Sequence, residues 1–183
     1  MNKKFKRFIA VVVCASMTVA SMASISVSAT STTRTIDNDS IADGYGNENV
    51  GFSYIKNISS LANGDARYSS SSSSNNRYTW KYPQLSSKST AQYATIEVGA
   101  YLAYSSWTDT AAAYYAEYYS YTYKKIGTIN QNKAPNGYSY IEAKDIRSLS
   151  AGGGHYSSSA YVVPSGNANQ TTGADEIKVT LSY

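Results

Sequence analysis

Tyrosine is the residue type in this sequence whose number and spacing most clearly suggest a function. The chain contains 19 tyrosines, and the window from 114 to 123 holds six of them. Side chains alternate between the two faces of a strand, so one row of these rings is expected to pack in a core while the other presents phenol groups to solvent. Such a face suits a glycan or a protein partner. We predict that its ligand-binding residues are Tyr115, Tyr119, Tyr121, Tyr123 and the nearby Trp107.

The alternative is a purely structural role for these rings. Exposed cross-strand tyrosines stabilise an antiparallel sheet by a few tenths to about 1 kcal/mol per pair and need no ligand. The sequence leaves both interpretations open.

Two glutamates raise the alternative of a small glycan hydrolase. Glu97 and Glu117 lie in segments predicted to be neighbouring strands, on faces that carry tyrosines. Glycosidases use two carboxyl groups on either side of the scissile bond. Solvent-facing glutamates of two amphipathic strands have the same pattern, and we therefore predict no catalytic residue.

Other catalytic and metal-binding chemistries lack the residues that they require. His155 is the only histidine, which excludes a site with two histidine ligands, and no G-x-S-x-G motif exposes a serine nucleophile. The acidic residues Asp37, Asp39 and Asp43 suggest calcium, but their spacing fails the EF-hand pattern. We predict a protein that is not an enzyme and that binds no cofactor or metal.

The first 29 residues predict export. Four basic residues precede an apolar stretch over residues 8–20, and a small-residue cleavage site ends at Ala29. The stretch is shorter than the roughly 20 apolar residues of a spanning helix. We therefore predict a signal peptide over 1–29, a secreted or extracellular protein, and no stable membrane anchor in the mature chain. Retention of the segment as an anchor is the alternative.

Removing this segment changes the charge and the thiol content of the chain. Its four basic residues are part of a total of 16 Lys and Arg, so 12 remain against 12 Asp and Glu. A neutral chain does not predict a nucleic-acid partner. Near-zero charge on a sheet with open edges predicts self-association. The only cysteine, Cys14, lies within the removed segment, so the mature chain has no disulfide.

Residues 30–76 differ in composition from the rest of the mature chain. They are rich in Ser, Asn and Asp and include six consecutive serines from Ser69 to Ser74. Such a segment buries too little apolar surface to offset its ordering entropy. We predict a largely disordered linker or N-terminal arm over 30–76 and a tyrosine-rich β domain over 77–183.

Alternation of side chains predicts the strands of that domain. Residues 94–104 place Ile96, Val98, Ala100 and Leu102 on one side, and we expect a hairpin with a second strand over 110–123. Further strands are expected at 125–130, 138–143, 157–163 and 176–183. The alternative for Asp109 to Lys125 is a helix capped by Asp109. Several short strands predict an all-β fold, either an antiparallel β-sandwich or a small barrel.

These observations favour a secreted, non-enzymatic β domain that binds a glycan, a cell-wall polymer or a protein through its tyrosine face. In composition, export signal and lack of cysteine, the mature chain also resembles small tyrosine-rich secreted bacteriocins of β-sandwich type. That resemblance implies an antimicrobial or toxin-like function as an alternative.

Overall fold

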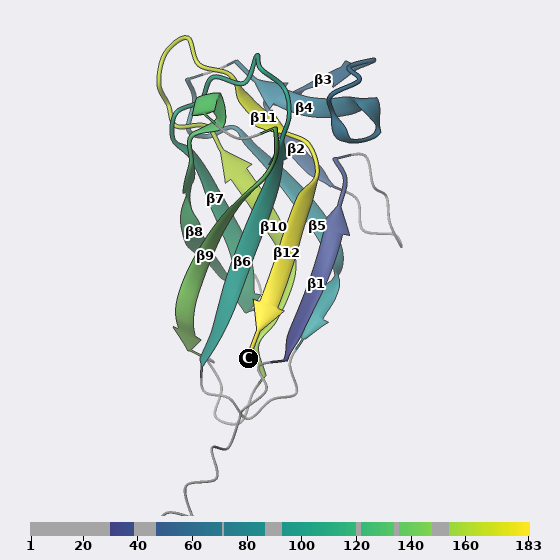
Figure 1. The fold of residues 1–183 in the computed structure, drawn as a ribbon. Coiled ribbons are helices and arrows are strands. Elements are labelled where there is room, and N and C mark those ends of the chain that lie inside the picture. Colours follow the sequence, from purple (N-terminus) through teal and green to yellow (C-terminus); the bar gives the residue numbers. More distant parts are fainter. Residues whose placement is uncertain are drawn as a thin grey trace, which may run out of the picture.

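The protein is an antiparallel β-sandwich, as its alternating patterns predict. The computed structural model describes residues 30–38, 47–70, 72–86, 93–119, 122–133, 136–147 and 154–183. Its strands form a four-stranded sheet, a five-stranded sheet and a shorter three-stranded sheet, and every strand pair is antiparallel. The four-stranded sheet faces the viewer in Figure 1, and the five-stranded sheet lies behind it. Residues 1–29, the predicted signal peptide, lie outside the described residues.

The four-stranded sheet has the order β1-β12-β6-β9. Its strands are β1 (Ser31–Ile36), β12 (Ile177–Ser182), β6 (Tyr93–Leu102) and β9 (Gly137–Arg147). The alternation predicted for residues 94–104 is confirmed, because Ile96, Val98, Ala100 and Leu102 are all buried. The other row of β6, which includes Glu97 and Tyr101, lies on the outer face of this sheet.

The five-stranded sheet has the order β2-β5-β10-β7-β8. Its strands are β2 (Glu48–Val50), β5 (Arg77–Ser86), β10 (Tyr156–Val163), β7 (Ala112–Tyr119) and β8 (Thr122–Ile129). The inner face of β5 contributes Tyr78, Trp80 and Tyr82 to the core, each at most 2% exposed. Its outward-facing residues therefore include Arg77, Thr79 and Lys81.

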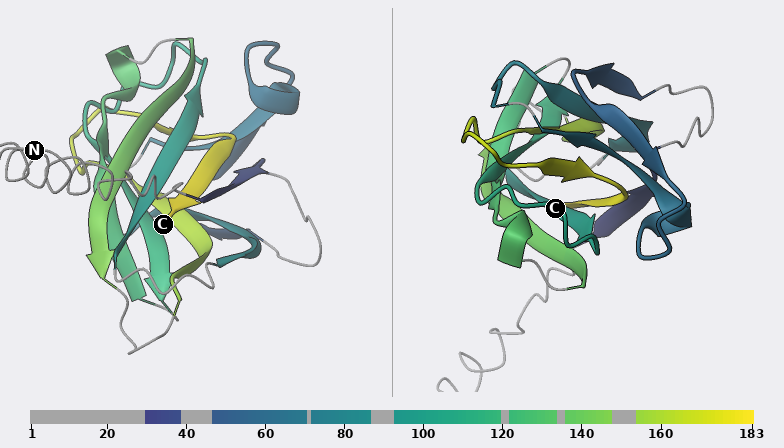
Figure 2. Two further views of the ribbon diagram at one scale, coloured as in Figure 1. Left: turned by 60° about the horizontal axis from the view of Figure 1, so that its bottom comes forward. Right: turned by 90° about the horizontal axis from the view of Figure 1, so that it is seen from above.

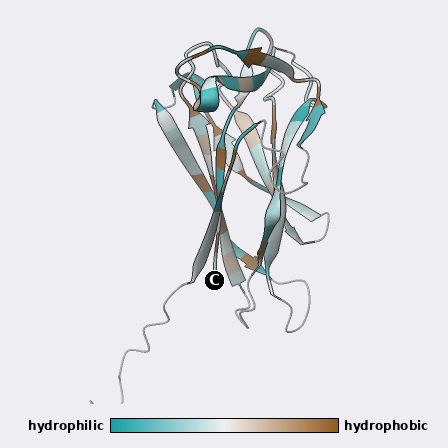
Figure 3. Ribbon diagram, turned by 90° about the vertical axis from the view of Figure 1, so that its right-hand side faces the viewer, coloured by the Kyte–Doolittle hydropathy of each residue, from teal (hydrophilic) through white to brown (hydrophobic). Residues whose placement is uncertain are grey.

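Three short strands lie across one end of the sandwich. They are β3 (Ser53–Lys56), β4 (Asp65–Ser69) and β11 (Thr172–Ala174), in the order β11-β4-β3. Figure 2 shows this end from above, and Figure 3 shows the two main layers from the side, with hydrophobic stretches along the strands of both. Two single 3₁₀ turns, η2 (Ala62–Gly64) and η3 (Gln131–Lys133), lie in connections. Within the described ranges, no helix is long and apolar enough to span a membrane.

Large aromatic side chains fill the core between the sheets, and the polar ends of several of them are hydrogen-bonded. Trp80 Nε1 donates to the Asp175 carbonyl oxygen at 2.8 Å, and Gln131 Nε2 donates to Tyr114 Oη at 2.9 Å. Tyr82 Oη and Ser157 Oγ are 2.7 Å apart. Burial raises the pKa values of Tyr82 and Tyr114 above the ordinary value for tyrosine, so these hydroxyls stay protonated at physiological pH.

The prediction of a largely disordered segment over 30–76 is wrong for most of its described residues. Strand β1 pairs with β12 from Ser31–Ser182 to Ile36–Ile177, and β2, β3 and β4 join the other two sheets. Phe52, Leu61 and Ala66 are buried in the core. The β fold therefore begins near Ser31 rather than Arg77, because polar strands gain their order from partners that are distant in the sequence.

The hairpin predicted between residues 94–104 and 110–123 is also wrong. Strand β6 pairs with β12 and β9 in one sheet, whereas β7 pairs with β10 and β8 in the other. The predicted second strand is instead the two strands β7 and β8, which pair with each other. The helix considered for Asp109 to Lys125 is not formed, since the described residues of this stretch are mainly strand.

The connection from β6 to β7 changes sheets because two of its side chains are buried. Trp107 is 1% exposed and Asp109 is fully buried. Asp109 accepts hydrogen bonds from Ala111 N and Ser165 N at 2.9 Å each, and from Thr172 Oγ1 at 2.5 Å. These contacts tie the connection to the segments before and within β11, so it cannot form a tight turn back along β6.

Asp175, which precedes β12, makes stability depend on pH. Its side chain is 2% exposed, and Oδ2 accepts a hydrogen bond from Ala62 N at 3.0 Å. Burial, with smaller contributions from the Asp37 and Asp65 charges, raises the pKa of Asp175 to about 7 from an ordinary 3.8. The unfolded chain loses this proton near pH 4 and the folded chain keeps it to about pH 7. Ionisation of Asp175 therefore lowers stability as pH rises between these values.

The variant Asp175→Asn should remove this dependence. We expect it to match the wild-type free energy of unfolding near pH 4 and to exceed it at pH 8 by about 2 kcal/mol, less than the full pKa difference gives because the structure relaxes around the buried charge. Urea unfolding of both proteins between pH 4 and pH 8 measures this difference. A difference that stays constant across the range would contradict the assignment.

Candidate functional site

A groove on the outer face of the five-stranded sheet is the best candidate site. It encloses about 490 Å³ and receives side chains from all five strands. It is lined by Glu48, Arg77, Thr79, Lys81, Gln84, Glu117, Tyr123, Tyr156, Ser158, Ser159 and Tyr161. The residues alternate in the sequence with core residues, so the strands themselves hold the lining side chains in place.

Two tyrosines, Tyr161 and Tyr123, line one wall of the groove, and a third, Tyr115 on a neighbouring strand, stacks on Tyr161. Tyr161 of β10 stacks on Tyr115 of β7 with ring centroids 4.7 Å apart and 13° between the ring planes. The Tyr123 ring of β8 lies 4.9 Å from Tyr161 at 60°. From the β5 side, the Arg77 guanidinium lies over the Tyr161 ring at 5.9 Å. We call Tyr115, Tyr123 and Tyr161 the tyrosine wall.

Partial burial of the wall affects the Tyr161 hydroxyl. Loss of solvent, followed by the proximity of Tyr115, raises the pKa of Tyr161 above its ordinary value. Tyr161 is therefore a neutral phenol at physiological pH, able to donate and to accept a hydrogen bond.

Glu117 lies at the base of the groove and is surrounded by hydroxyl groups. It is only 4% exposed. Its Oε2 accepts hydrogen bonds from Ser158 Oγ and, at 3.2 Å, from Ser159 Oγ. Ser159 Oγ lies 2.7 Å from Tyr123 Oη. The register of β10 against β5 shifts between Ser157 and Ser159, and such a bulge redirects side chains so that two consecutive serines reach one carboxylate.

Ion pairs occupy the side of the groove opposite the tyrosine wall. Lys81 Nζ lies 2.5 Å from Glu48 Oε1, and Arg77 lies 3.9 Å from Glu48 Oε2. The hydrogen bond from Lys81 lowers the pKa of Glu48, so this carboxylate is ionised at neutral pH. Thr79 lies between these two cations on β5 and is 2% exposed.

Two of the tyrosines predicted from the sequence lie at this candidate site. The structure brings Tyr115 and Tyr123 together, although on two strands of a hairpin rather than one strand. Tyr119 lies at the end of β7, its side chain is outside what the structure describes, and Tyr121 lies outside the described residues. Trp107 is a core residue whose ring lies 6.0 Å from Tyr104, so it does not belong to the exposed face predicted for it.

The residues that sequence reasoning missed come from strands β2, β5 and β10. Tyr161 stands opposite Tyr115 in the β7–β10 register, and Arg77, Lys81 and Glu48 come together through the β2–β5 pair. The outward position of Tyr161 could have been read from the alternation of β10. Its partners could not, because they depend on which strands become neighbours.

The carboxylate pair considered for hydrolysis does not form. Glu97 lies on β6 in the four-stranded sheet, opposite Thr180 and Glu142 in the register. Glu117 lies on the outer face of the five-stranded sheet, in the other layer. Two carboxylates on opposite faces of a sandwich cannot flank one glycosidic bond.

The acidic residues near the N-terminal end of the fold are engaged with amides. Asp37 accepts a hydrogen bond from Asn63, and Asp65 accepts one from Asn38 Nδ2 at 2.8 Å. Across the described part of the chain, no group of three or more acidic, histidine or cysteine side chains is placed to hold a metal ion. Asp39 and Asp43 lie outside the described residues.

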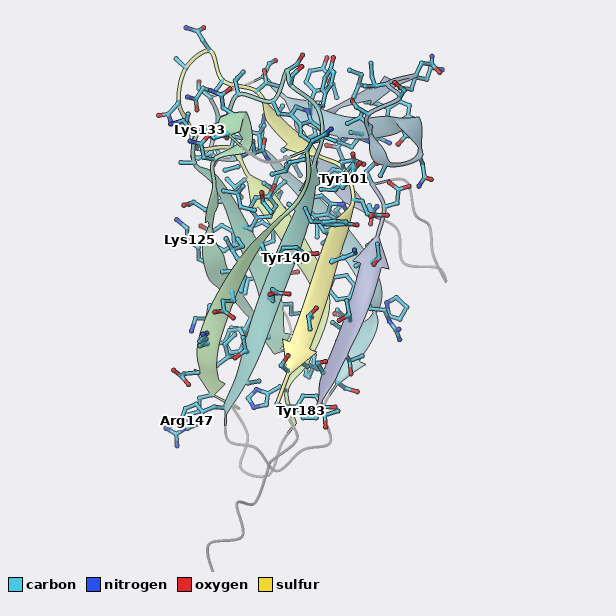
Figure 4. All side chains as sticks on the ribbon, in the orientation of Figure 1. Tyr101, Lys125, Lys133, Tyr140, Arg147 and Tyr183 are labelled. Carbon is cyan, nitrogen blue, oxygen red and sulfur yellow. The ribbon has the colours of Figure 1, made fainter. Side chains whose placement is uncertain are left out.

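A second group of tyrosines lies on the outer face of the four-stranded sheet. Tyr138 is 5.3 Å from Tyr101 and 5.9 Å from Tyr140, measured between ring centroids. Tyr140 is 53% exposed, and Figure 4 shows it with Tyr101 on the four-stranded sheet, the layer nearer the viewer and not the one that carries the groove. Tyr140 is therefore a matched exposed tyrosine for experiments on the tyrosine wall.

Comparisons with known proteins give only a distant structural likeness. No protein-family model and no curated protein matches the chain. Among solved structures, CsCBM6-3 from Clostridium stercorarium, determined in complex with cellobiose, matches 81% of this chain and 90% of its own. The TM-score is 0.36 and the sequence identity is 13%. A similarity this distant assigns neither a family nor a ligand to this chain.

Proposed function

We propose that this protein is a non-catalytic extracellular glycan-binding domain and that the groove of the five-stranded sheet is its binding site. The observation that carries the proposal is the pairing of a tyrosine wall with a polar floor in one concave site. Sugars have apolar C–H faces and many hydroxyl groups, so they need aromatic surface and hydrogen-bonding partners together. The export signal predicted over residues 1–29 supports an extracellular setting.

The size and shape of the groove favour a glycan over a protein partner. About 490 Å³ falls within the range of small-ligand sites, and it accommodates a short saccharide segment. Protein interfaces are broader and have desolvated apolar centres. The floor of this groove instead holds carboxylates, cations and serine hydroxyls.

The charges in the groove support binding without hydrolysis. A glycosidase needs one carboxylic acid that holds its proton at working pH, together with a second carboxylate. The groove is lined by two carboxylates, Glu48 and Glu117. The pKa of Glu48 is lowered by Lys81, so Glu48 is unsuited to be the acid.

Binding to polysaccharides tests this proposal. The purified protein should be retained by at least one member of a panel of immobilised glycans that includes cellulose, xylan, mannan, galactan, chitin and peptidoglycan. Tyr161→Ala should weaken binding about tenfold or more, since it removes the central ring of the wall, which corresponds to about 1.4 kcal/mol. Tyr140→Ala, on the opposite face, should bind like wild type.

Two results would overturn the proposal. One is the absence of binding to every glycan of the panel by a folded protein. The other is equal loss of binding in Tyr161→Ala and Tyr140→Ala. Circular dichroism of each variant establishes that the fold is retained.

A further inference from the structure

The hydroxyl protons around Glu117 have fixed directions. Ser158 and Ser159 both donate to Glu117 Oε2. A serine hydroxyl carries a single proton, so Ser159 must accept the hydrogen bond that joins it to Tyr123 at 2.7 Å. Tyr123 is therefore the donor in that bond. Two hydroxyl protons are therefore directed to the carboxylate, and the third, from Tyr123, is directed to Ser159 Oγ.

This ordering determines what the base of the groove offers to a ligand. Tyr123, Ser158 and Ser159 have committed their protons inward, so what they have left is oxygen lone pairs. Lone pairs accept hydrogen bonds and repel other acceptors. A ligand at this position must therefore supply hydrogen-bond donors, as the hydroxyl groups of a sugar do.

The charges that line the groove cancel. Arg77 and Lys81 are its two cations, and both lie within ion-pair distance of Glu48. Glu117 adds a second negative charge at the base. Lys125 lies opposite Tyr115 in the β7–β8 register and is not among the lining residues. The lining therefore has no net positive charge to attract an anionic ligand, and such a ligand must also approach the Glu117 carboxylate, which is buried and fixed on β7.

We infer that the groove selects uncharged glycans, which bind as hydrogen-bond donors to the oxygen atoms around Glu117, and that it discriminates against uronates and other anionic glycans. This inference rests on the proposed function, because it specifies the ligand class of the same site. It makes Glu117 the residue that determines specificity. It also gives Glu48 a separate role, which is to offset part of the positive charge of Lys81 and Arg77.

Pairs of polymers that differ only at C6 test the inference. Glucan and mannan oligomers of β-1,4 linkage are each compared with the glucuronan or mannuronan oligomer of the same linkage and length by isothermal titration. The neutral member of any pair that binds should bind about tenfold or more tightly. Its affinity should change little between low and high salt, because no net charge is involved.

Two variants separate specificity from simple loss of structure. Glu117→Gln keeps the shape of the side chain and removes the charge at the base, so the preference for the neutral polymer should fall by about tenfold. Glu48→Gln lies at an exposed position and releases Lys81 and Arg77, so binding of the uronan should become stronger and sensitive to salt. Glu97→Gln, on the opposite face, should leave both affinities unchanged.

The outcomes distinguish this inference from the proposed function. If neither member of any pair binds, the proposed function fails. If the uronan of a pair binds as tightly as its neutral partner or more tightly, the protein is still a glycan-binding domain but the inference is overturned. Unchanged preference in both folded variants, Glu117→Gln and Glu48→Gln, would overturn it as well.

Discussion

Replacing Asp109 with alanine should lower the free energy of unfolding by about 4 kcal/mol, which is most of the stability of a marginal domain. The Asp109 carboxylate is fully buried and accepts hydrogen bonds from Ala111 N, Ser165 N and Thr172 Oγ1. Alanine leaves these three donors without their partner, and an unsatisfied buried donor costs about 1–3 kcal/mol. Urea unfolding followed by tyrosine and tryptophan fluorescence measures the loss.

The control for this prediction is Asp109→Asn. Asparagine retains one acceptor oxygen and nearly the same shape, so its destabilisation should lie between wild type and the alanine variant. A loss below about 1 kcal/mol for Asp109→Ala, typical of a substitution at an exposed site, would show that the connection from β6 to β7 is held by other contacts.

Gly173→Ala should be the second strongly destabilising substitution, with a loss of about 3 kcal/mol or more. A Cβ atom added to Gly173 would lie 2.0 Å from Cδ2 and Cε2 of Trp107. Neither side can yield easily, because Gly173 is in β11 and Trp107 is 1% exposed. The methyl group must displace a fully packed indole ring. Thermal and urea unfolding give the magnitude.

Gly99→Ala is the matched comparison for this substitution. A Cβ atom at Gly99 would lie 2.4 Å from Cε1 of Tyr140, a contact of the same kind. Tyr140 is 53% exposed and can rotate away into solvent, so the cost should stay below about 1 kcal/mol.

A double-mutant cycle identifies the source of the Gly173 effect. In a Trp107→Ala background, Gly173→Ala should cost less than about 1 kcal/mol, because the ring that it displaces is gone. An equal loss in the free energy of unfolding in both backgrounds would mean that Gly173 is required for its backbone conformation, and not because a side chain there would displace Trp107.

Local patterns in the sequence predict the strands of this protein better than their partners. The alternation of Ile96, Val98, Ala100 and Leu102 is a property of one strand, and it predicted β6 with one buried face. The choice of β12 and β9 as neighbours of β6 depends on the buried contacts of Trp107 and Asp109 and on strands far away in the chain. No short-range pattern encodes that choice.

The same distinction explains the polar N-terminal segment. Strand β1 has the sequence STTRTI, which buries only Ile36 among its six residues. By composition it is a linker, yet each of its six residues has a register partner in β12. β-Branched threonines suit an edge strand once a partner is present.

The sequence predicted the kind of side chain found at the candidate site but not all of its residues. The density of tyrosines indicated an aromatic face, and Tyr115 and Tyr123 belong to it. Tyr161, Arg77 and Lys81 join them only through strand pairing, and the bulge in β10 directs Ser158 and Ser159 to one carboxylate. Trp107 was wrongly included among the ligand-binding residues. An aromatic residue near a turn can be buried in the core, as Trp107 is.

The pairing of β1 with β12 has a mechanical consequence. Backbone hydrogen bonds of 3.0 Å join Thr30 to Tyr183 in both directions, so residues 30 and 183 lie side by side at one end of this strand pair. A tensile load applied through these two residues pulls across the ladder and opens its bonds in sequence, from Ser31 and Ser182 towards Ile36 and Ile177. Bonds loaded one after another yield at lower force than bonds loaded together in shear. We therefore expect β1 to separate from β12 at low force under such a load, before the rest of the sandwich is loaded.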